Sequence, residues 1–192
     1  MISIAQSDSD GAEPAWVGEV LRFWFEELAE ADWFAKRDDI DARIRERFLM
    51  LREKLVADGG LAVDSPRAVL AAVLVLDQFS RNAFRSDPRA FAADPIARDI
   101  SRSAISRGLD VAMTKNERLF LYLPFEHSEN ADDQLLACRL IESLGREDLT
   151  RYAIAHKEII DRFGRFPHRN GVLGRPSTDA EIEFLRAPGS SF

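Results

Sequence analysis

Nine consecutive apolar residues, from Ala68 to Leu76, constrain the fold of this chain more than any other feature. They follow Ser65 and Pro66, which are typical of a helix N-cap and of the first helical position. A helix that is apolar on every side has no face for solvent, so it must lie in the middle of a bundle. We therefore expect other helices to surround it. The segment is also far too short to span a bilayer.

The remaining helices are predicted from capping residues, apolar residues at helical spacing, and glycine or proline at the ends. Thr114 with Glu117, and Thr178 with Glu181, have the spacing of capping boxes, and we expect one helix to break near Pro124. The expected ranges are 14–28, 38–58, 65–85, 94–106, 114–124, 128–144, 147–163 and 178–187. Alternating strand patterns are absent. We predict an all-α fold of seven to nine helices, with successive antiparallel pairs joined by short turns.

The helical patterns also assign individual side chains to the core or the surface. We expect Trp33 and Phe34 to hold a connection against the core, and Arg52 to lie on a solvent-facing side of its helix. His156 shares a helical face with apolar residues, which indicates a hydrogen-bonded core histidine. Cys138 lies among leucines and isoleucine, which favours a small core residue over a nucleophile.

Length and charge limit the classes of protein to consider. A chain of 192 residues fits one domain, which we expect over residues 15–187, with tails at 1–14 and 188–192. A net charge of −7 argues against general nucleic-acid or anionic-membrane binding. The single cysteine excludes an intramolecular disulfide and fits a cytoplasmic location. We predict no cofactor and no secretory signal.

A basic stretch at 156–175 stands out in this acidic chain. Gly164 fits the left-handed position that ends a helix, and Pro167 keeps the next residues out of regular structure. A loop of this kind can present several donors together. These are Arg165, His168, Arg169, Asn170 and Arg175.

Three polar clusters interrupt apolar helices, at 77–85, 126–130 and 165–175. Their surroundings read Leu-Asp-Gln-Phe-Ser-Arg-Asn-Ala-Phe-Arg at 76–85, Leu-Pro-Phe-Glu-His-Ser-Glu at 123–129, Phe-Gly-Arg-Phe-Pro-His-Arg-Asn at 163–170 and Leu-Gly-Arg-Pro-Ser-Thr at 173–178. With these motifs the chain resembles an uncharacterised bacterial family, domain of unknown function 924, from about Val20 to Leu185. The resemblance implies a tetratricopeptide-like, right-handed array of helix pairs and implies no activity. The consensus tetratricopeptide residues are not visible, so the fold alone does not indicate peptide binding.

The first functional interpretation is one pocket for an anionic small molecule, formed where the three clusters meet. Forked arginine donors suit carboxylate or phosphate, and a histidine can move a proton near neutral pH. The expected catalytic residues are His127, His168 and Glu129. The expected ligand-binding residues are Asp77, Arg81, Asn82, Arg85, Arg165, Arg169, Asn170 and Arg175. No activated serine or cysteine motif is present, so the sequence does not support covalent catalysis. Whether the protein turns the bound molecule over stays open.

Three other interpretations stay open. An internal salt-bridge network would account for the same charges, with Arg81 on Asp77 and other arginines on Glu126, Glu129 or Glu181. A metal site could use His127, His156 or His168 with Glu126 or Glu129, but no local ligand motif supports it and we predict none. Finally, the helices could form a scaffold without catalysis that binds an acidic peptide or another protein partner.

Overall fold

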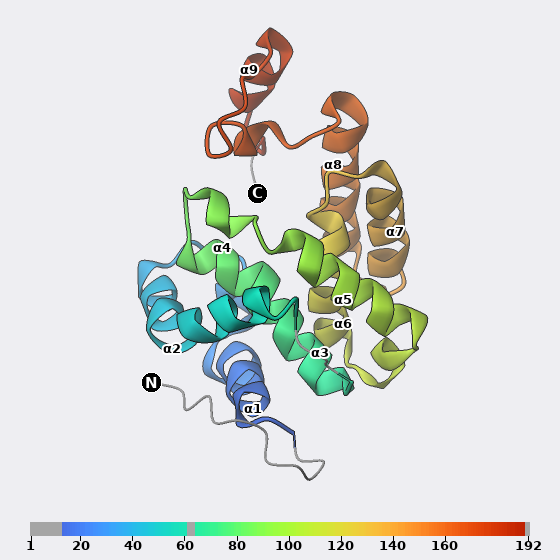
Figure 1. Cartoon of the computed structure of the whole chain (residues 1–192). Coiled ribbons are helices and arrows are strands. Elements are labelled where there is room, and N and C mark those ends of the chain that lie inside the picture. Colours follow the sequence, from blue (N-terminus) through green and yellow to red (C-terminus); the bar gives the residue numbers. More distant parts are fainter. Residues whose placement is uncertain (1–12, 61–63, 191–192) are drawn as a thin grey trace. The chain divides into compact units, whose positions relative to one another are not determined.

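The computed structural model describes residues 13–60 and 64–190. Helices joined by turns and loops make up these ranges, and they contain no strand. The helices are α1 (Ala15–Arg22), α2 (Asp38–Ala57), α3 (Pro66–Val73), α4 (Ser80–Ala83), α5 (Asp94–Ser106), α6 (Lys115–Glu126), α7 (Ala131–Glu142), α8 (Glu147–Phe163) and α9 (Asp179–Leu185). A π-helical turn, Phe23–Glu27, extends α1, and another, Leu74–Phe79, joins α3 to α4 (Figure 1). The described residues thus form eight continuous helices. The all-α prediction is confirmed.

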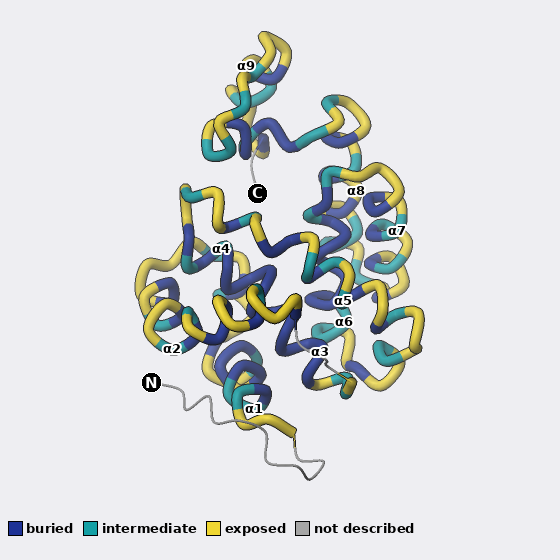
Figure 2. The backbone as a smooth tube through the Cα atoms, in the orientation of Figure 1, coloured by how far each residue is buried: buried dark blue, intermediate teal, exposed yellow. Residues whose placement is uncertain are grey.

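The apolar segment is buried as predicted. Every residue from Ala68 to Ser80 is buried, and the tube of α3 is dark along this stretch in Figure 2. The Ser65 hydroxyl accepts from the Ala68 N–H at 3.1 Å, so the predicted cap and Pro66 start this helix. α1 and α5 pack against α3, and α2 packs against α4 and the π-helical turn before it. The absence of a polar face therefore did determine the position of this helix.

The chain divides into two compact units. Unit 1 holds the chain up to Arg85 together with Arg89–Pro124, and unit 2 holds Ser86–Pro88 and the chain from Phe125 on. The prediction of one domain over residues 15–187 stays a prediction. No helix in the described ranges is long and apolar enough to cross a membrane.

Unit 2 consists chiefly of the last three helices. α7 and α8 lie side by side (Figure 1). The Asn130 side chain caps α7 through the N–H groups of Asp132 and Asp133. α8 ends at Gly164, whose φ of 68° is the left-handed conformation that the sequence predicts there. The capping box that Thr178 begins opens α9, as expected.

Two of three local expectations are confirmed and one was wrong. α6 ends at Glu126, two residues past Pro124, near the proline at which it was expected to break. Trp33 is buried and donates to the Trp24 carbonyl at 2.9 Å, and Phe34, although 61% exposed, stacks on the buried ring of Phe120 with the centroids 6.0 Å apart. Arg52 is buried and not solvent-facing, since its Nε donates to the Ser80 hydroxyl at 3.2 Å and its guanidinium lies over a phenylalanine ring.

Candidate functional site

In the first polar cluster, Arg81 forms ion pairs with two aspartates of unit 1, Asp77 and Asp94. Arg81 lies 3.0 Å from a carboxylate oxygen of Asp77 and forms a forked pair with Asp94 through two bonds of 2.9 Å. Asp77 is completely buried at the π-helical turn. Burial acts to lower the pKa of Arg81, but the two carboxylates outweigh it and raise that pKa. Arg81 is therefore a fixed internal cation.

The other two residues of this cluster that were predicted to bind the ligand, Asn82 and Arg85, form hydrogen bonds to a third aspartate, Asp41. Asn82 Nδ2 donates to Asp41 Oδ1 at 2.8 Å, and Arg85 Nη2 donates to the same oxygen at 2.9 Å. Arg85 Nε bonds the second oxygen, Asp41 Oδ2. Asp41 lies one and two helical turns before Ile44 and Phe48 on the buried stripe of α2. An aspartate on the apolar stripe of a helix is the sequence signal that could have identified Asp41 as a buried partner for Asn82 and Arg85.

The second and third clusters meet in unit 2 through Glu129. Its carboxylate accepts from the Phe166 N–H at 2.8 Å and from Arg175 Nη1 and Nη2 at 2.7 and 2.9 Å. Burial acts to raise the pKa of Glu129, but the bonds from Arg175 and the Phe166 N–H lower it below its ordinary value. Glu129 thus fixes the start of the basic loop.

A second ion pair fixes the end of the loop. Arg165 donates to both Glu181 oxygens, at 2.6 and 2.8 Å, and these bonds together with the Thr178 N–H lower the pKa of Glu181. Asn170 accepts from Arg175 Nε at 2.9 Å and donates to Ser177 at 3.1 Å. We call Glu129, Arg175, Asn170, Arg165 and Glu181 the loop framework. The salt-bridge interpretation accounts for both of its arginines.

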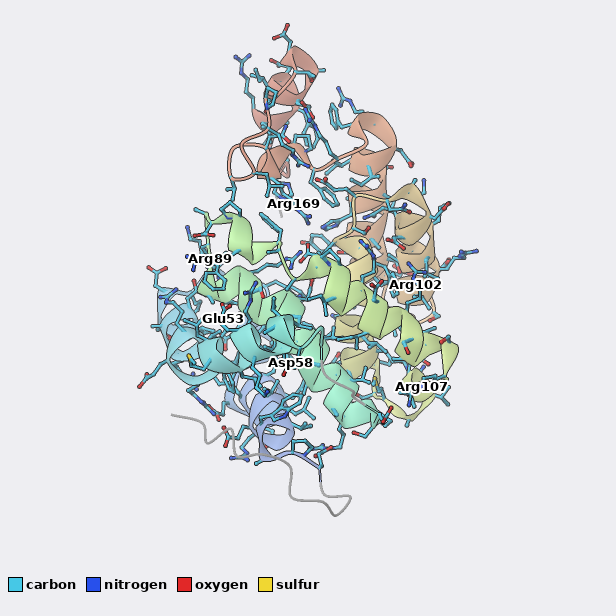
Figure 3. The ribbon with its side chains drawn as sticks, in the orientation of Figure 1. Glu53, Asp58, Arg89, Arg102, Arg107 and Arg169 are labelled. Carbon is cyan, nitrogen blue, oxygen red and sulfur yellow. The ribbon has the colours of Figure 1, made fainter. Side chains whose placement is uncertain are left out.

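All three histidines gather beside this framework, two of them against the buried ring of Phe166 and the third beside His156. The His156 and His168 rings each lie with their centroids 5.7 Å from that of Phe166, and the His127 ring lies 6.4 Å from that of His156. The Arg169 guanidinium lies 4.5 Å from the Phe166 centroid, and its Nη1 donates to the His127 carbonyl at 3.0 Å. Figure 3 labels Arg169 in the segment between α8 and α9. We call these five residues the histidine cluster.

His156 differs from the other two histidines in its burial. His156 is buried, and its Nδ1 lies 2.9 Å from the Tyr152 carbonyl and 3.3 Å from Glu126 Oε1. Since a backbone carbonyl can only accept, Nδ1 carries the proton. Burial, together with the nearby His127 and Arg169, lowers the pKa of His156 from 6.5 to about 3, although the Tyr152 bond opposes this shift. His156 is neutral at pH 7 and buried, whereas His127 and His168 are half-buried residues.

The predicted site residues therefore fall into two groups. The structure brings His127, His168, Glu129, Arg165, Arg169, Asn170 and Arg175 together in unit 2, and Asp77, Arg81, Asn82 and Arg85 into the carboxylate network of unit 1. The sequence interpretation identified His156 as a hydrogen-bonded core histidine, which is confirmed, but it did not include the residue in the cluster. Helical spacing reveals that a side chain is buried and gives no information on its neighbours from other helices.

Two further features are of less chemical use. Among the described residues, no group of three or more His, Cys, Asp or Glu side chains could hold a metal ion. A surface hollow of about 420 Å³ lies at the turn between α7 and α8, lined by Glu142, Gly145, Arg146, Glu147, Thr150 and Arg151. None of these residues belongs to the histidine cluster.

Cys138 is half-buried, and burial raises the pKa of its thiol. A raised pKa leaves less of the nucleophilic thiolate at neutral pH, so a role as nucleophile is not favoured.

Comparison with known proteins gives one family and one solved structure. A family described as bacterial protein of unknown function (DUF924) matches residues 20–189. The solved structure of a protein of unknown function, ATU0120 from Agrobacterium tumefaciens, is similar with 38% sequence identity and a TM-score of 0.83. The match covers 89% of this chain and 97% of that one. No curated protein matches.

Proposed function

The chain belongs to the DUF924 family of bacterial proteins of unknown function, and we propose that this member binds an anionic small molecule at the histidine cluster. The observation that carries the proposal is that the Arg169 guanidinium and the His168 ring both lie against the buried ring of Phe166, while Arg169 Nη1 donates to the backbone carbonyl of His127. A guanidinium presents planar donors that match a carboxylate or phosphate, and an imidazole adds one donor when neutral and two when charged.

The loop framework supports this proposal because it holds the groups in place. Arg165 and Arg175 are bonded to Glu181 and Glu129, so in the proposal they shape the loop and do not contact the ligand. Glu129, which the sequence analysis grouped with the catalytic residues, likewise becomes a framework residue. A site whose donors are fixed before binding loses less entropy when the ligand arrives.

Any proton transfer at this site would use His127 or His168. His156 keeps its neutral form down to a pH of about 3, so it can orient its neighbours but cannot donate a proton from a charged ring at neutral pH. An anion beside Arg169 would favour the charged forms of the two outer imidazoles, because an opposite charge nearby stabilises a protonated group. The proposed class of chemistry is thus anion binding with histidine acid–base exchange.

Calorimetry with inorganic phosphate and a panel of small carboxylates tests the proposal. We expect Arg169→Ala to weaken binding of the best anion by tenfold or more, equivalent to about 1.4 kcal/mol. The matched control is Arg139→Ala, which removes an exposed arginine of α7 that belongs neither to the cluster nor to the loop framework. Failure of the parent protein to bind any anion, or equal weakening by both substitutions, would contradict the proposal.

The alternative is a scaffold for an acidic peptide or another protein, built as a tetratricopeptide-like array of helix pairs. It draws on the α7–α8 pair, where Leu135, Tyr152 and Ile154 are exposed apolar side chains. Such a partner would bury these three side chains, whereas a small anion would not. A change in Tyr152 fluorescence, or slower hydrogen exchange of the α7 and α8 amides, on adding an acidic peptide would favour the scaffold.

A further inference from the structure

The turn that carries His127 is held by side chains from outside it. α6 ends at Glu126, and the last carbonyls of a helix have no partner within the helix. Arg169 Nη1 donates to the His127 carbonyl at 3.0 Å. The carbonyls on both sides of it, those of Glu126 and Ser128, accept from one further side chain, Gln134 of α7, at 2.6 and 2.7 Å.

Gln134 has a geometry that admits only one orientation. Its amide is completely buried, and Nε2 also lies 3.4 Å from the Phe125 carbonyl. Turning the amide over would bring Oε1 against three carbonyl oxygens and remove every one of these bonds. The contacts themselves therefore assign the NH₂ group to the side of the turn.

For the same reason, few side chains other than glutamine can satisfy the contacts at position 134. The position needs a neutral donor that reaches three carbonyls in a buried place, and a glutamate there would oppose oxygen to oxygen. Oε1 of Gln134 has no hydrogen-bond partner within the ranges that the structure describes. A buried acceptor without a partner costs about 1–3 kcal/mol. The hydrogen bonds that Nε2 donates therefore have to outweigh the cost of burying Oε1.

We propose that Gln134 is a positioning residue for His127. By fixing the carbonyls of Glu126 and Ser128, it sets the backbone from which the His127 ring reaches toward His156, and Arg169 fixes the third carbonyl between them. In this arrangement Gln134 contacts no ligand and acts through the backbone alone. The inference rests on the proposed function for its effect on binding, but its effect on the His127 ring does not need a ligand.

The test is Gln134→Met, which keeps the length and apolar stem of the side chain and removes the donor. The matched control is Gln78→Met in unit 1, another buried glutamine, whose Nε2 donates to Asp77 at 2.6 Å. Histidine ring proton signals are followed by NMR across pH, and since the chain has three histidines, single His→Asn variants assign them. Binding of inorganic phosphate is measured on the same samples.

We expect Gln134→Met to move the His127 signal and its titration midpoint, and to raise the Kd for inorganic phosphate about tenfold. Gln78→Met should leave both unchanged at a similar loss of thermal stability. Unmoved His127 signals in Gln134→Met would overturn the inference, whether or not phosphate binds. If instead the parent protein fails to bind phosphate while the His127 signal does move, the proposed function fails and the positioning role stands.

A second variant covers the case in which Gln134→Met does not fold. Gln134→Asn keeps a neutral amide but withdraws it by one methylene group, beyond hydrogen-bond reach of the turn. The same signals and the same phosphate titration then decide the question. A Gln134→Asn protein with the His127 titration of the parent would overturn the inference.

Discussion

His156 should make the protein sensitive to mild acid, and His156→Asn should remove that sensitivity. The ring is 5% exposed, and its Nδ1–H donates to the Tyr152 carbonyl. Asparagine places an amide nitrogen at the position of Nδ1, so the donor can remain while the titrating ring is lost. The two proteins should then differ mainly in one property, the uptake of a proton on unfolding.

The sign and size of the effect follow from the two pKa values. The pKa of His156 is about 3 in the folded protein against 6.5 when unperturbed, so below pH 6.5 the unfolded chain binds more protons. Stability is fully present above pH 6.5 and is lost as pH falls toward 3. At pH 5 the loss is about 2 kcal/mol, from 1.36 kcal/mol for each pKa unit. Carboxylates with lowered pKa values, such as Glu129, lose their contribution only at lower pH.

Urea unfolding at several pH values from 7.5 to 5 measures this loss. With an m value of about 2 kcal/mol/M, the parent midpoint should fall by about 1 M more than the midpoint of His156→Asn over this range. A constant offset between the two proteins is expected and is not informative, since the substitution also changes packing. Parallel curves across the whole range would refute the reasoning, because they would mean that the pKa of His156 is the same in the folded and the unfolded protein.

Three further predictions concern the fold. Val73→Asp places a charge at a fully buried position of α3 and should destabilise by about 3 kcal/mol or more, seen as a loss of the cooperative thermal transition; a melting temperature within a degree or two of the parent would contradict the central placement. Gly60→Ala should cost about 1–3 kcal/mol more than Gly59→Ala in chemical unfolding, because both glycines have positive φ but only at Gly60 does the added Cβ come within 2.6 Å of the Ile100 side chain. Equal losses would show that Ile100 moves aside freely. Thr178→Ala should destabilise α9 by about 1 kcal/mol through loss of its cap, detected by faster amide exchange confined to that helix, and unchanged exchange there would argue against the capping box.

Much of the helical framework could be predicted from the sequence, because the signals that set helix ends are local. Ser65, Asn130 and Thr178 cap helices through backbone N–H groups two or three residues away, and Gly164 ends α8 by its own φ angle. These contacts form within one turn of the chain and do not depend on what packs against it. The burial of the segment from Ala68 to Leu76 was predictable for a different reason, since any fold must hide a helix without a polar side.

The candidate site was predicted in part. The sequence predicted that the clusters at 77–85, 126–130 and 165–175 would share one pocket, because charged residues that interrupt apolar helices need partners when they are buried. The second and third clusters are in contact through Glu129 and Arg175. The pocket that all three clusters were expected to form stays a prediction. Within unit 1 the cluster at 77–85 pairs with Asp41 and Asp94.

Only the tertiary structure decided which partner each charge takes and which side chains surround Phe166. Arg85 and Asp41 are 44 residues apart, and Arg169 and His127 are 42 residues apart. No helical period relates such positions, so packing between helices alone brings them together. The same holds for Arg52, which the helical period predicted to face solvent, whereas a serine and a carbonyl from other segments made its burial possible. By itself the sequence determined which segments are helical and which of them lies at the centre, because caps and apolar periodicity act over a few residues. The neighbours of the histidines are set by contacts that exist only after the helices have packed.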